Sequence, residues 1–194
     1  MPQLEISQRK TLMPTVYGVP QSPFVRKVCV ALLEKNISYD HNPIAPFPPQ
    51  NDTAQFRTMS PLGKIPAYED DDVGICDSSV ILAYLERAHP APALYPSAAK
   101  NLARALWIEE FADSKLVEGV GGLFFEKIVK PNFLKKESDQ ENIDRCVNVT
   151  IPFAFDYLET QVDGEYLVGN SFCVADIGVG AMRRQYQMLG ESAD

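Results

Sequence analysis

The stretch Ser22-Pro23-Phe24-Val25-Arg26-Lys27-Val28-Cys29 predicts a helix that begins directly after a strand and a turn. The strand-like run Thr15-Val16-Tyr17 precedes it, and Gly18-Val19-Pro20 forms the turn between them. Serine is a preferred N-cap and proline is favoured at the first helical position. From Val25 onward, apolar residues follow the i, i+3, i+4, i+7, i+8 spacing of an amphipathic helix. A hydroxyl group is therefore expected at the positive end of a helix dipole, a place suited to an anion.

The composition is that of a globular protein. The 194 residues are 45% hydrophobic and 23% charged, enough to form one large domain or two small ones. The net charge of -8 argues against nucleic acid or an anionic membrane as the main partner. No apolar run approaches the roughly 20 residues of a membrane span. Residues 1–13 lack the apolar core of a signal peptide, so we expect a polar extension and a cytoplasmic protein.

Cysteine and histidine do not occur at the spacings of a metal site or of a disulfide framework. There is no Cys-x-x-Cys motif, and the residues concerned are far apart in the chain: Cys29, Cys76, Cys146, Cys173, His41 and His89. We therefore expect no bound metal ion.

Strands and helices are expected to alternate as far as residue 88. The expected strands cover 15–17, 37–41, 64–69 and 74–76, and the expected helices cover 23–35, 53–59 and a segment from about Ser79. This order predicts a small mixed α/β sheet with helices packed on its faces.

Strand signals end at the Pro- and Ala-rich connector 89–97. Long helices are expected over 98–116, over 143–162 and from about Val174. Gly119, Gly121 and Gly122 are expected to break or bend the first of them. The second half, 98–194, is therefore predicted to be an all-α domain.

Four motifs occur in a fixed order and together form a specific signature. They are Ser-Pro-Phe-Val-Arg-Lys-Val from Ser22, Gly-Lys-Ile-Pro over 63–66, Asp-Ser-Ser-Val-Ile-x-x-Tyr-Leu over 77–85, and Phe-x-x-Ala-Asp-Ile over 172–177. From about residue 14 onward the chain resembles the cytosolic glutathione transferases, in particular bacterial-like members of the serine type. The resemblance implies a thioredoxin-like α/β domain over 14–88 that binds glutathione, which is a co-substrate and not a resident cofactor.

The resemblance places Ser22 beside the sulfur of glutathione, where its hydroxyl donates a hydrogen bond to the thiolate. A free thiol has a pKa of about 8.5, and lowering this pKa by two units needs roughly 2.7 kcal/mol of preference for the thiolate. One charge-assisted hydrogen bond of about 1.5–3 kcal/mol supplies that free energy. The alternative is that Ser22 only caps the helix. The accompanying motifs favour the catalytic interpretation.

The resemblance also implies a set of glutathione contacts. Ile65-Pro66 is expected to be a cis peptide that exposes the backbone of Ile65 to the cysteinyl part of glutathione. Lys64 is expected near the glycyl carboxylate, or alternatively in solvent. Ser78 is expected to bind the glutamyl carboxylate and Asp77 the ammonium group, at a helix N-terminus that both residues also suit as N-cap signals.

The helical half carries candidates for a second pocket and for a fold motif. Trp107 and Phe111 share one helix face at i, i+4 spacing. In relatives this helix lines the pocket of the electrophile, although most such aromatic pairs are core. Cys173 stands where the family usually has Ser or Thr, so only half of a capping box is expected, with Asp176 in a folding role. Because relatives continue beyond this helix, the chain is expected to be truncated after Asp194.

The expected function is conjugation of the glutathione thiolate to a small hydrophobic electrophile in detoxification. An aryl halide, an epoxide and an unsaturated carbonyl compound are candidate substrates. One alternative is a glutathione-dependent oxidoreductase or isomerase, although a thiol-disulfide enzyme would favour cysteine at position 22. The other is a non-catalytic interaction protein of the same fold.

A homodimer is also expected, as the resemblance implies. The predicted contact would mix apolar and paired charged groups on two helices: Val80, Tyr84, Arg87, Arg104, Glu86, Glu109 and Glu110.

Overall fold

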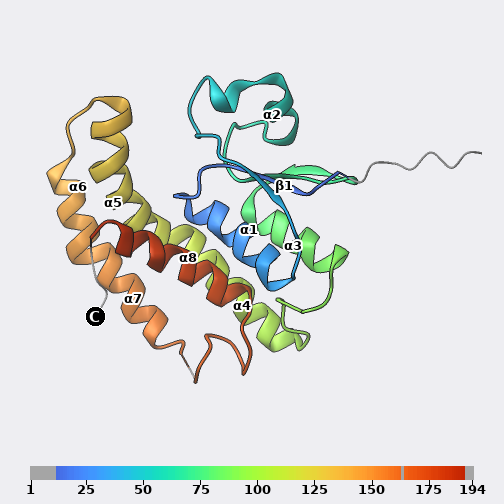
Figure 1. Cartoon of the computed structure of the whole chain (residues 1–194). Coiled ribbons are helices and arrows are strands. Elements are labelled where there is room, and N and C mark those ends of the chain that lie inside the picture. Colours follow the sequence, from blue (N-terminus) through green and yellow to red (C-terminus); the bar gives the residue numbers. More distant parts are fainter. Residues whose placement is uncertain (1–11, 163, 191–194) are drawn as a thin grey trace, which may run out of the picture.

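The computed structural model describes residues 12–162 and 164–190, and its strands form one mixed sheet (Figure 1). Nearly all of the expected extension, residues 1–13, lies outside the described residues. The strand order is β2-β1-β3-β4. β1 runs parallel to β2, and β3 is antiparallel to both β1 and β4. The strands are β1 (Thr15–Tyr17), β2 (Asp40–Asn42), β3 (Ala67–Glu69) and β4 (Gly74–Cys76).

The predicted third strand, 64–69, is shorter than expected. β3 begins only at Ala67 because Pro66 has no N–H group to donate to the sheet. The register pairs Tyr17 with Ala67 and Ala67 with Cys76. The segments that follow β1, precede β3 and follow β4 therefore meet at the same end of the strands.

Two helices pack on one face of the sheet and a shorter helix lies on the other (Figure 1). α1 (Pro23–Glu34) and α3 (Ser78–Ala88) contact each other. Their buried apolar residues belong to the main core. α2 (Ala54–Met59), preceded by a 3-10 turn over Gln50–Asp52, contributes Phe56 and Met59 to a small separate cluster. These helices agree closely with the predicted ranges.

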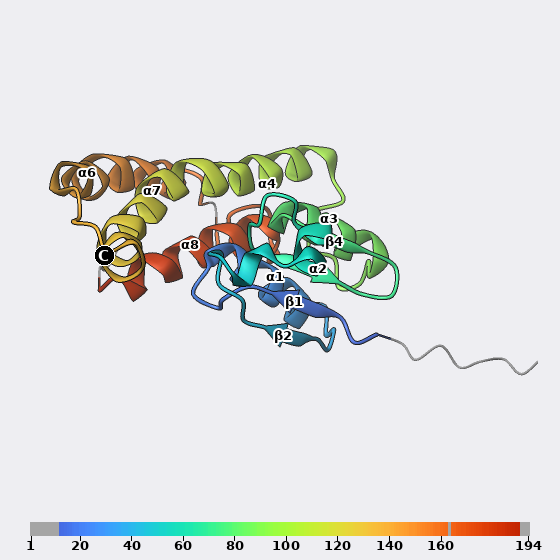
Figure 2. The same cartoon turned by 90° about the horizontal axis from the view of Figure 1, so that it is seen from above.

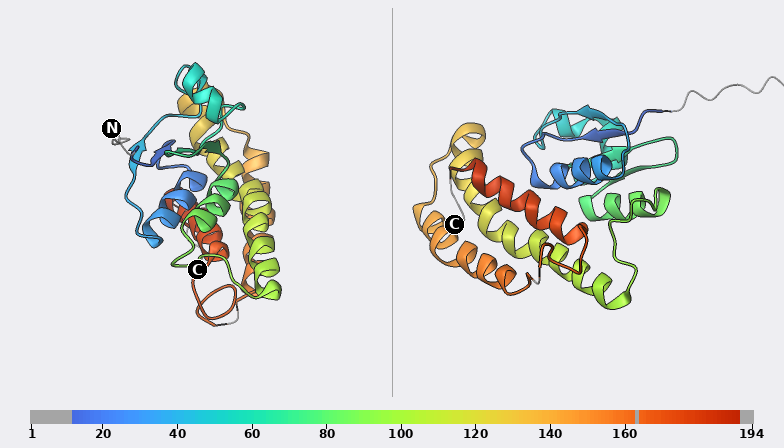
Figure 3. Two further views of the ribbon diagram at one scale, coloured as in Figure 1. Left: turned by 90° about the vertical axis from the view of Figure 1, so that its right-hand side faces the viewer. Right: turned by 60° about the horizontal axis from the view of Figure 1, so that its bottom comes forward.

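The second half is helical throughout its described elements. α4 (Ala99–Phe111) continues without a break through π-helical turns over Ala112–Gly121, α5 (Gly122–Phe124) and further π-helical turns over Phe125–Leu134. α6 (Gln140–Arg145) continues through Cys146–Thr150 into α7 (Ile151–Glu159). The last helix, α8 (Val174–Met188), contacts both α4 and α1 (Figures 2 and 3). α8 therefore connects the helical layer to the sheet half.

The predicted break at Gly119, Gly121 and Gly122 is wrong, because the helix continues through all three, and Gly119 and Gly122 permit close packing of a neighbouring helix instead. A Cβ atom on Gly119 would lie 2.7 Å from Cγ1 of Ile151 on the neighbouring helix. A Cβ atom on Gly122 would lie 3.1 Å from the sulfur of Cys146. The long helix can approach the 140–159 segment only because these positions lack side chains.

A buried ionic network joins the two halves. Lys27 of α1 is fully buried, and its Nζ lies 3.0 Å from Glu109 Oε1 and 2.6 Å from Asp113 Oδ2. The same ammonium group donates to the hydroxyl of Ser79 on α3 at 3.3 Å. Three helices are thus held at one point inside the protein.

Asp176 fixes the start of α8. Its carboxylate accepts backbone N–H groups of Cys173 and of Leu167, each at 2.9 Å. The expected folding role is confirmed. The expectation of half a capping box is corrected, since both halves of the box are present, with the side chain of Cys173 facing the backbone N–H of Asp176.

Glu126 ties the end of the long helix to the segment that follows it. Its carboxylate is buried and accepts from Asp139 N–H at 2.8 Å, from Asn142 at 2.9 Å and from Lys130 at 2.6 Å. Burial alone raises the pKa of a carboxyl group, but these hydrogen bonds and the charge of Lys130 outweigh it and lower the pKa of Glu126 to about 2.

Within the described residues, no helix has the length and apolar character needed to cross a bilayer. The same residues contain no group of three or more His, Cys, Asp or Glu side chains arranged to hold a metal ion.

Replacing Gly119 by alanine should lower the free energy of unfolding by about 1–3 kcal/mol, because the new methyl group would overpack Ile151. Gly180 is the matched control, since it lies exposed on α8 and a Cβ atom there would meet no described atom within 4 Å. Gly180→Ala should stabilise by about 0.5–1 kcal/mol. Urea denaturation measures both variants. Equal stabilisation in both would show that Gly119 is not needed for helix contact.

Replacing Glu126 by glutamine should lower the free energy of unfolding by about 1–3 kcal/mol at pH 7. Because the folded-state pKa is depressed, the carboxylate stabilises the protein above its unfolded pKa of about 4.3 and loses that effect as the pH falls toward about 2. The difference between wild type and variant should therefore shrink between about pH 5 and pH 2. Urea denaturation across this range checks it, with exposed Glu137→Gln as control. A difference that stays constant with pH would contradict this assignment.

Candidate functional site

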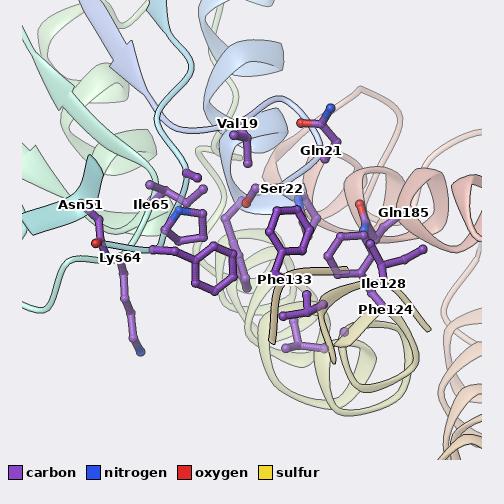
Figure 4. Close-up of a pocket in the computed structure, with 18 of the residues that line it drawn as sticks. Val19, Gln21, Ser22, Asn51, Lys64, Ile65, Phe124, Ile128, Phe133 and Gln185 are labelled. Atoms are coloured by element: carbon purple, nitrogen blue, oxygen red, sulfur yellow. The ribbon is translucent and has the colours of Figure 1, made fainter. Parts of the chain in front are cut away.

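A large, mostly apolar cavity lies where the two halves meet. Its volume is about 910 Å³. One wall comes from the β1–α1 turn and the loops before α2 and β3, and the other from the long helix and α8 (Figure 4). Ser22 and Lys64 are sequence-predicted residues on its wall, together with Ile65. The structure thus brings three of the predicted residues to one cavity.

Ser22 is the N-cap of α1 and also faces the cavity. Its Oγ accepts the backbone N–H of Val25 at 3.4 Å, a long hydrogen bond, and the residue is half-buried. Figure 4 shows it between the two walls. The capping and the site interpretations of Ser22 are therefore compatible, because the hydroxyl can still donate its own proton to a ligand.

Gly18 allows this turn to pack against the loop before β3. Its φ is +138°, and a Cβ atom there would lie 2.5 Å from Cγ2 of Val25 and 2.9 Å from Cβ of Ile65. Any other residue would separate the serine turn from Ile65.

Lys64 and Ile65 form the side of the cavity next to the sheet. The Ile65–Pro66 peptide is cis, as predicted. Lys64 is exposed, and Figure 4 shows its amino group extending away from Ser22.

Asp77 and Ser78 lie at the start of α3, outside the residues that line the cavity. The carboxylate of Asp77 accepts backbone N–H groups of Ser79 at 3.0 Å and of Val80 at 3.2 Å, so Asp77 is the N-cap of α3. Ser78 is buried at the first helical position. Because Ala67 pairs with Cys76, Asp77 and Ser78 lie at the same end of the strands as Pro66.

The structure does not bring Trp107 and Phe111 to the cavity. Both belong to the contact between α4 and α7. The indole N–H of Trp107 donates to the hydroxyl of Tyr157 at 2.6 Å, and the ring centroid of Phe111 lies 4.5 Å from that of Tyr157. The aromatic residues that line the cavity are Phe24, Phe47, Phe124 and Phe133 instead.

Two buried amide side chains line the cavity and were not predicted. Asn51 donates to the carbonyl oxygen of Gly63 at 2.9 Å, while its own Oδ1 has no partner within the described residues. Neither Nε2 nor Oε1 of Gln185 has a partner in that part of the chain. A polar residue in a short 3-10 turn or on a helix carries no sequence signal of such a position.

Comparison with known proteins gives consistent matches to one family. Residues 16–93 match the family model described as glutathione S-transferase, N-terminal domain. An uncharacterized GST-like protein of Escherichia coli (strain K12), YibF, is 33% identical over 138 residues, which cover 68% of this chain and 65% of that protein. The maleylacetoacetate isomerase of Mus musculus is 28% identical, with 84% of this chain and 74% of the relative covered.

A solved structure agrees with these sequence matches. The human glutathione transferase theta-2, in complex with glutathione and an unknown ligand, superposes with a TM-score of 0.83 at 21% identity and covers 92% of this chain and 74% of its own. That likeness shows the common fold, a thioredoxin-like mixed sheet followed by a helical region. The family model and the sequence relatives place this chain in the cytosolic glutathione transferase superfamily.

Proposed function

We propose that this protein is a glutathione transferase that joins the thiol of glutathione to a hydrophobic electrophile. The observation that carries the proposal is Ser22, which stands at a helix N-terminus and faces an apolar cavity of about 910 Å³. Glutathione would lie along the sheet side of this cavity, and the electrophile along the helical side.

Ser22 would act on the ionisation of the thiol. Its hydroxyl donates a hydrogen bond to the sulfur anion, and the N-terminus of α1 adds the positive end of its dipole. A preference of roughly 2.7 kcal/mol for the anion lowers the thiol pKa by about two units. The thiolate then attacks the electrophilic carbon, a C–S bond forms, and a leaving group such as halide departs with its bonding electrons.

The remaining predicted residues would hold glutathione in place. The backbone of Ile65 pairs with the cysteinyl part, and Lys64 attracts the glycyl carboxylate. Ser78 and Asp77 take the γ-glutamyl group at the start of α3, where the two N–H groups accepted by Asp77 fix its carboxylate.

A glutathione-dependent isomerase is the second candidate, because the mouse relative that carries this name matches 84% of the chain. Serine at position 22 disfavours thiol-disulfide chemistry, which uses a cysteine nucleophile.

A role in detoxification and a cytoplasmic location stay predictions from the sequence.

Ser22→Ala should lower kcat with a chromogenic aryl halide by up to about 100-fold, the rate equivalent of roughly 2.7 kcal/mol. The thiol pKa of bound glutathione, followed by thiolate absorbance, should rise toward about 8.5. Ser78→Ala is the contrasting variant. It should raise KM more than it lowers kcat, because its contact lies far from the sulfur. An unchanged thiol pKa in Ser22→Ala would remove Ser22 from the mechanism.

We also propose a homodimer, with a contact that differs from the one first expected. Glu86 and Glu109 are engaged within the chain by Lys35 and Lys27, so they are not available to pair across an interface. Val80 on α3 is 52% exposed, so an apolar contact there supports the dimer better than paired charges.

Sedimentation at micromolar concentration should give twice the chain mass of 21.6 kDa. Val80→Glu should shift the equilibrium toward monomer, since it would bury a charge in the contact. Val149→Glu, at a position that is 62% exposed on another helix, should leave the mass unchanged. A wild-type protein that sediments as a monomer at every concentration would refute the dimer.

A further inference from the structure

Gln185 of α8 is a buried polar side chain that the protein leaves without a partner. The residue is 1% exposed, and neither atom of its amide has a hydrogen-bond partner within the described residues. Leaving a buried donor or acceptor unpaired is costly, and most such groups in folded proteins are paired. Because Gln185 also lines the large cavity, its missing partner can be supplied by a ligand.

The surroundings of Gln185 are otherwise apolar. Among the described lining residues between 117 and 189, it alone has a polar side chain. Figure 4 shows it on the same side as Phe124 and Ile128, opposite Lys64, with Ser22 between the two sides. Gln185 therefore lies on the wall assigned to the electrophile and away from the groups assigned to glutathione.

A single neutral amide in an apolar wall favours a neutral polar group on the ligand, because a buried anion would have no countercharge there. The terminal torsion of glutamine is broad, so the amide can turn toward such a group at little cost. Its Nε2 is a donor suited to a carbonyl oxygen.

We propose that Gln185 binds the carbonyl oxygen of the second substrate, and that this substrate is an α,β-unsaturated carbonyl compound with an apolar body. The inference rests on the proposed transferase function. In such a compound the oxygen is three bonds from the attacked carbon, so it can extend from the sulfur toward the helical wall that holds Gln185. In an epoxide the oxygen is bonded to the attacked carbon itself and would stay beside the sulfur.

Gln185 would act on the charge that develops during attack. The thiolate sulfur forms a bond to the β-carbon, the electron pair of the C=C bond moves toward the carbonyl carbon, and the carbonyl π pair moves onto oxygen. The N–H group of Gln185 stabilises this enolate oxygen. A proton from solvent then adds to the α-carbon, which balances the proton released when the thiol ionised, and the product is a saturated thioether.

The test compares two substrates in Gln185→Met, a substitution that keeps an unbranched side chain and removes the amide. With an aryl enone, 4-phenyl-3-buten-2-one, kcat/KM should fall about 100-fold, as expected for the loss of one oxyanion donor. With benzyl chloride, which has no oxygen to accept a hydrogen bond, it should change little, which also shows that the variant is folded. Gln187→Met, an exposed position on the same helix, should leave both rates unchanged.

Thermal unfolding gives a second readout. Because Gln185→Met removes an unpaired buried amide, the melting temperature should stay the same or rise. Equal loss of rate with both substrates, or an unaffected enone rate, would overturn the role of Gln185 while the transferase function stands. A larger loss with styrene oxide than with the enone would overturn the substrate class. Wild-type protein that turns over neither the enone nor benzyl chloride would overturn the function itself.

Discussion

The position of one buried ammonium group sets the relation between the two halves of this protein. Lys27 has no access to water, and two carboxylates and a hydroxyl from α3 and the long helix that begins with α4 surround it. Removing one partner of such a buried pair typically costs about 3–5 kcal/mol, because the other charge stays behind without compensation. Sliding of the helical layer over α1 would break these contacts. The same contacts therefore hold the opposing walls of the cavity at a fixed separation.

α8 reinforces this arrangement from the other side. Arg26, the neighbour of Lys27 on α1, donates to the carbonyl oxygen of Ala181 at 2.8 Å. Gln185 lies one helical turn further along α8, so the register of α8 against α1 also determines where this amide enters the wall. Adjacent residues of one sequence motif thus contribute to the assembly of the cavity through different partners, Lys27 through the long helix and Arg26 through α8.

Local signals were sufficient to predict the sheet half. The N-caps Ser22 and Asp77 depend on residues close in sequence, whereas the cis bond at Pro66 was implied by the resemblance to the family, and the structure contains all three. The helical half depends on packing between distant residues. Gly119 alone predicts a break, because its close contact with Ile151 is not visible in the sequence. Since the helix continues instead, Phe124 and Phe133 lie on the wall of the cavity. Trp107 and Phe111 are aromatic, as a pocket for an electrophile requires, but their contacts with Tyr157 keep them in the contact between α4 and α7 and away from the cavity.

The stacked rings of Phe47 and Phe133 bring the two halves together at the rim of the cavity. Their centroids are 5.5 Å apart, and Phe133 is 58% exposed. An aromatic pair of this kind contributes about 0.5–1.5 kcal/mol, no more than a few times the thermal energy at room temperature. The rim of the cavity is therefore held by a contact whose free energy is close to the thermal energy, whereas the buried charges around Lys27 hold the helices behind it.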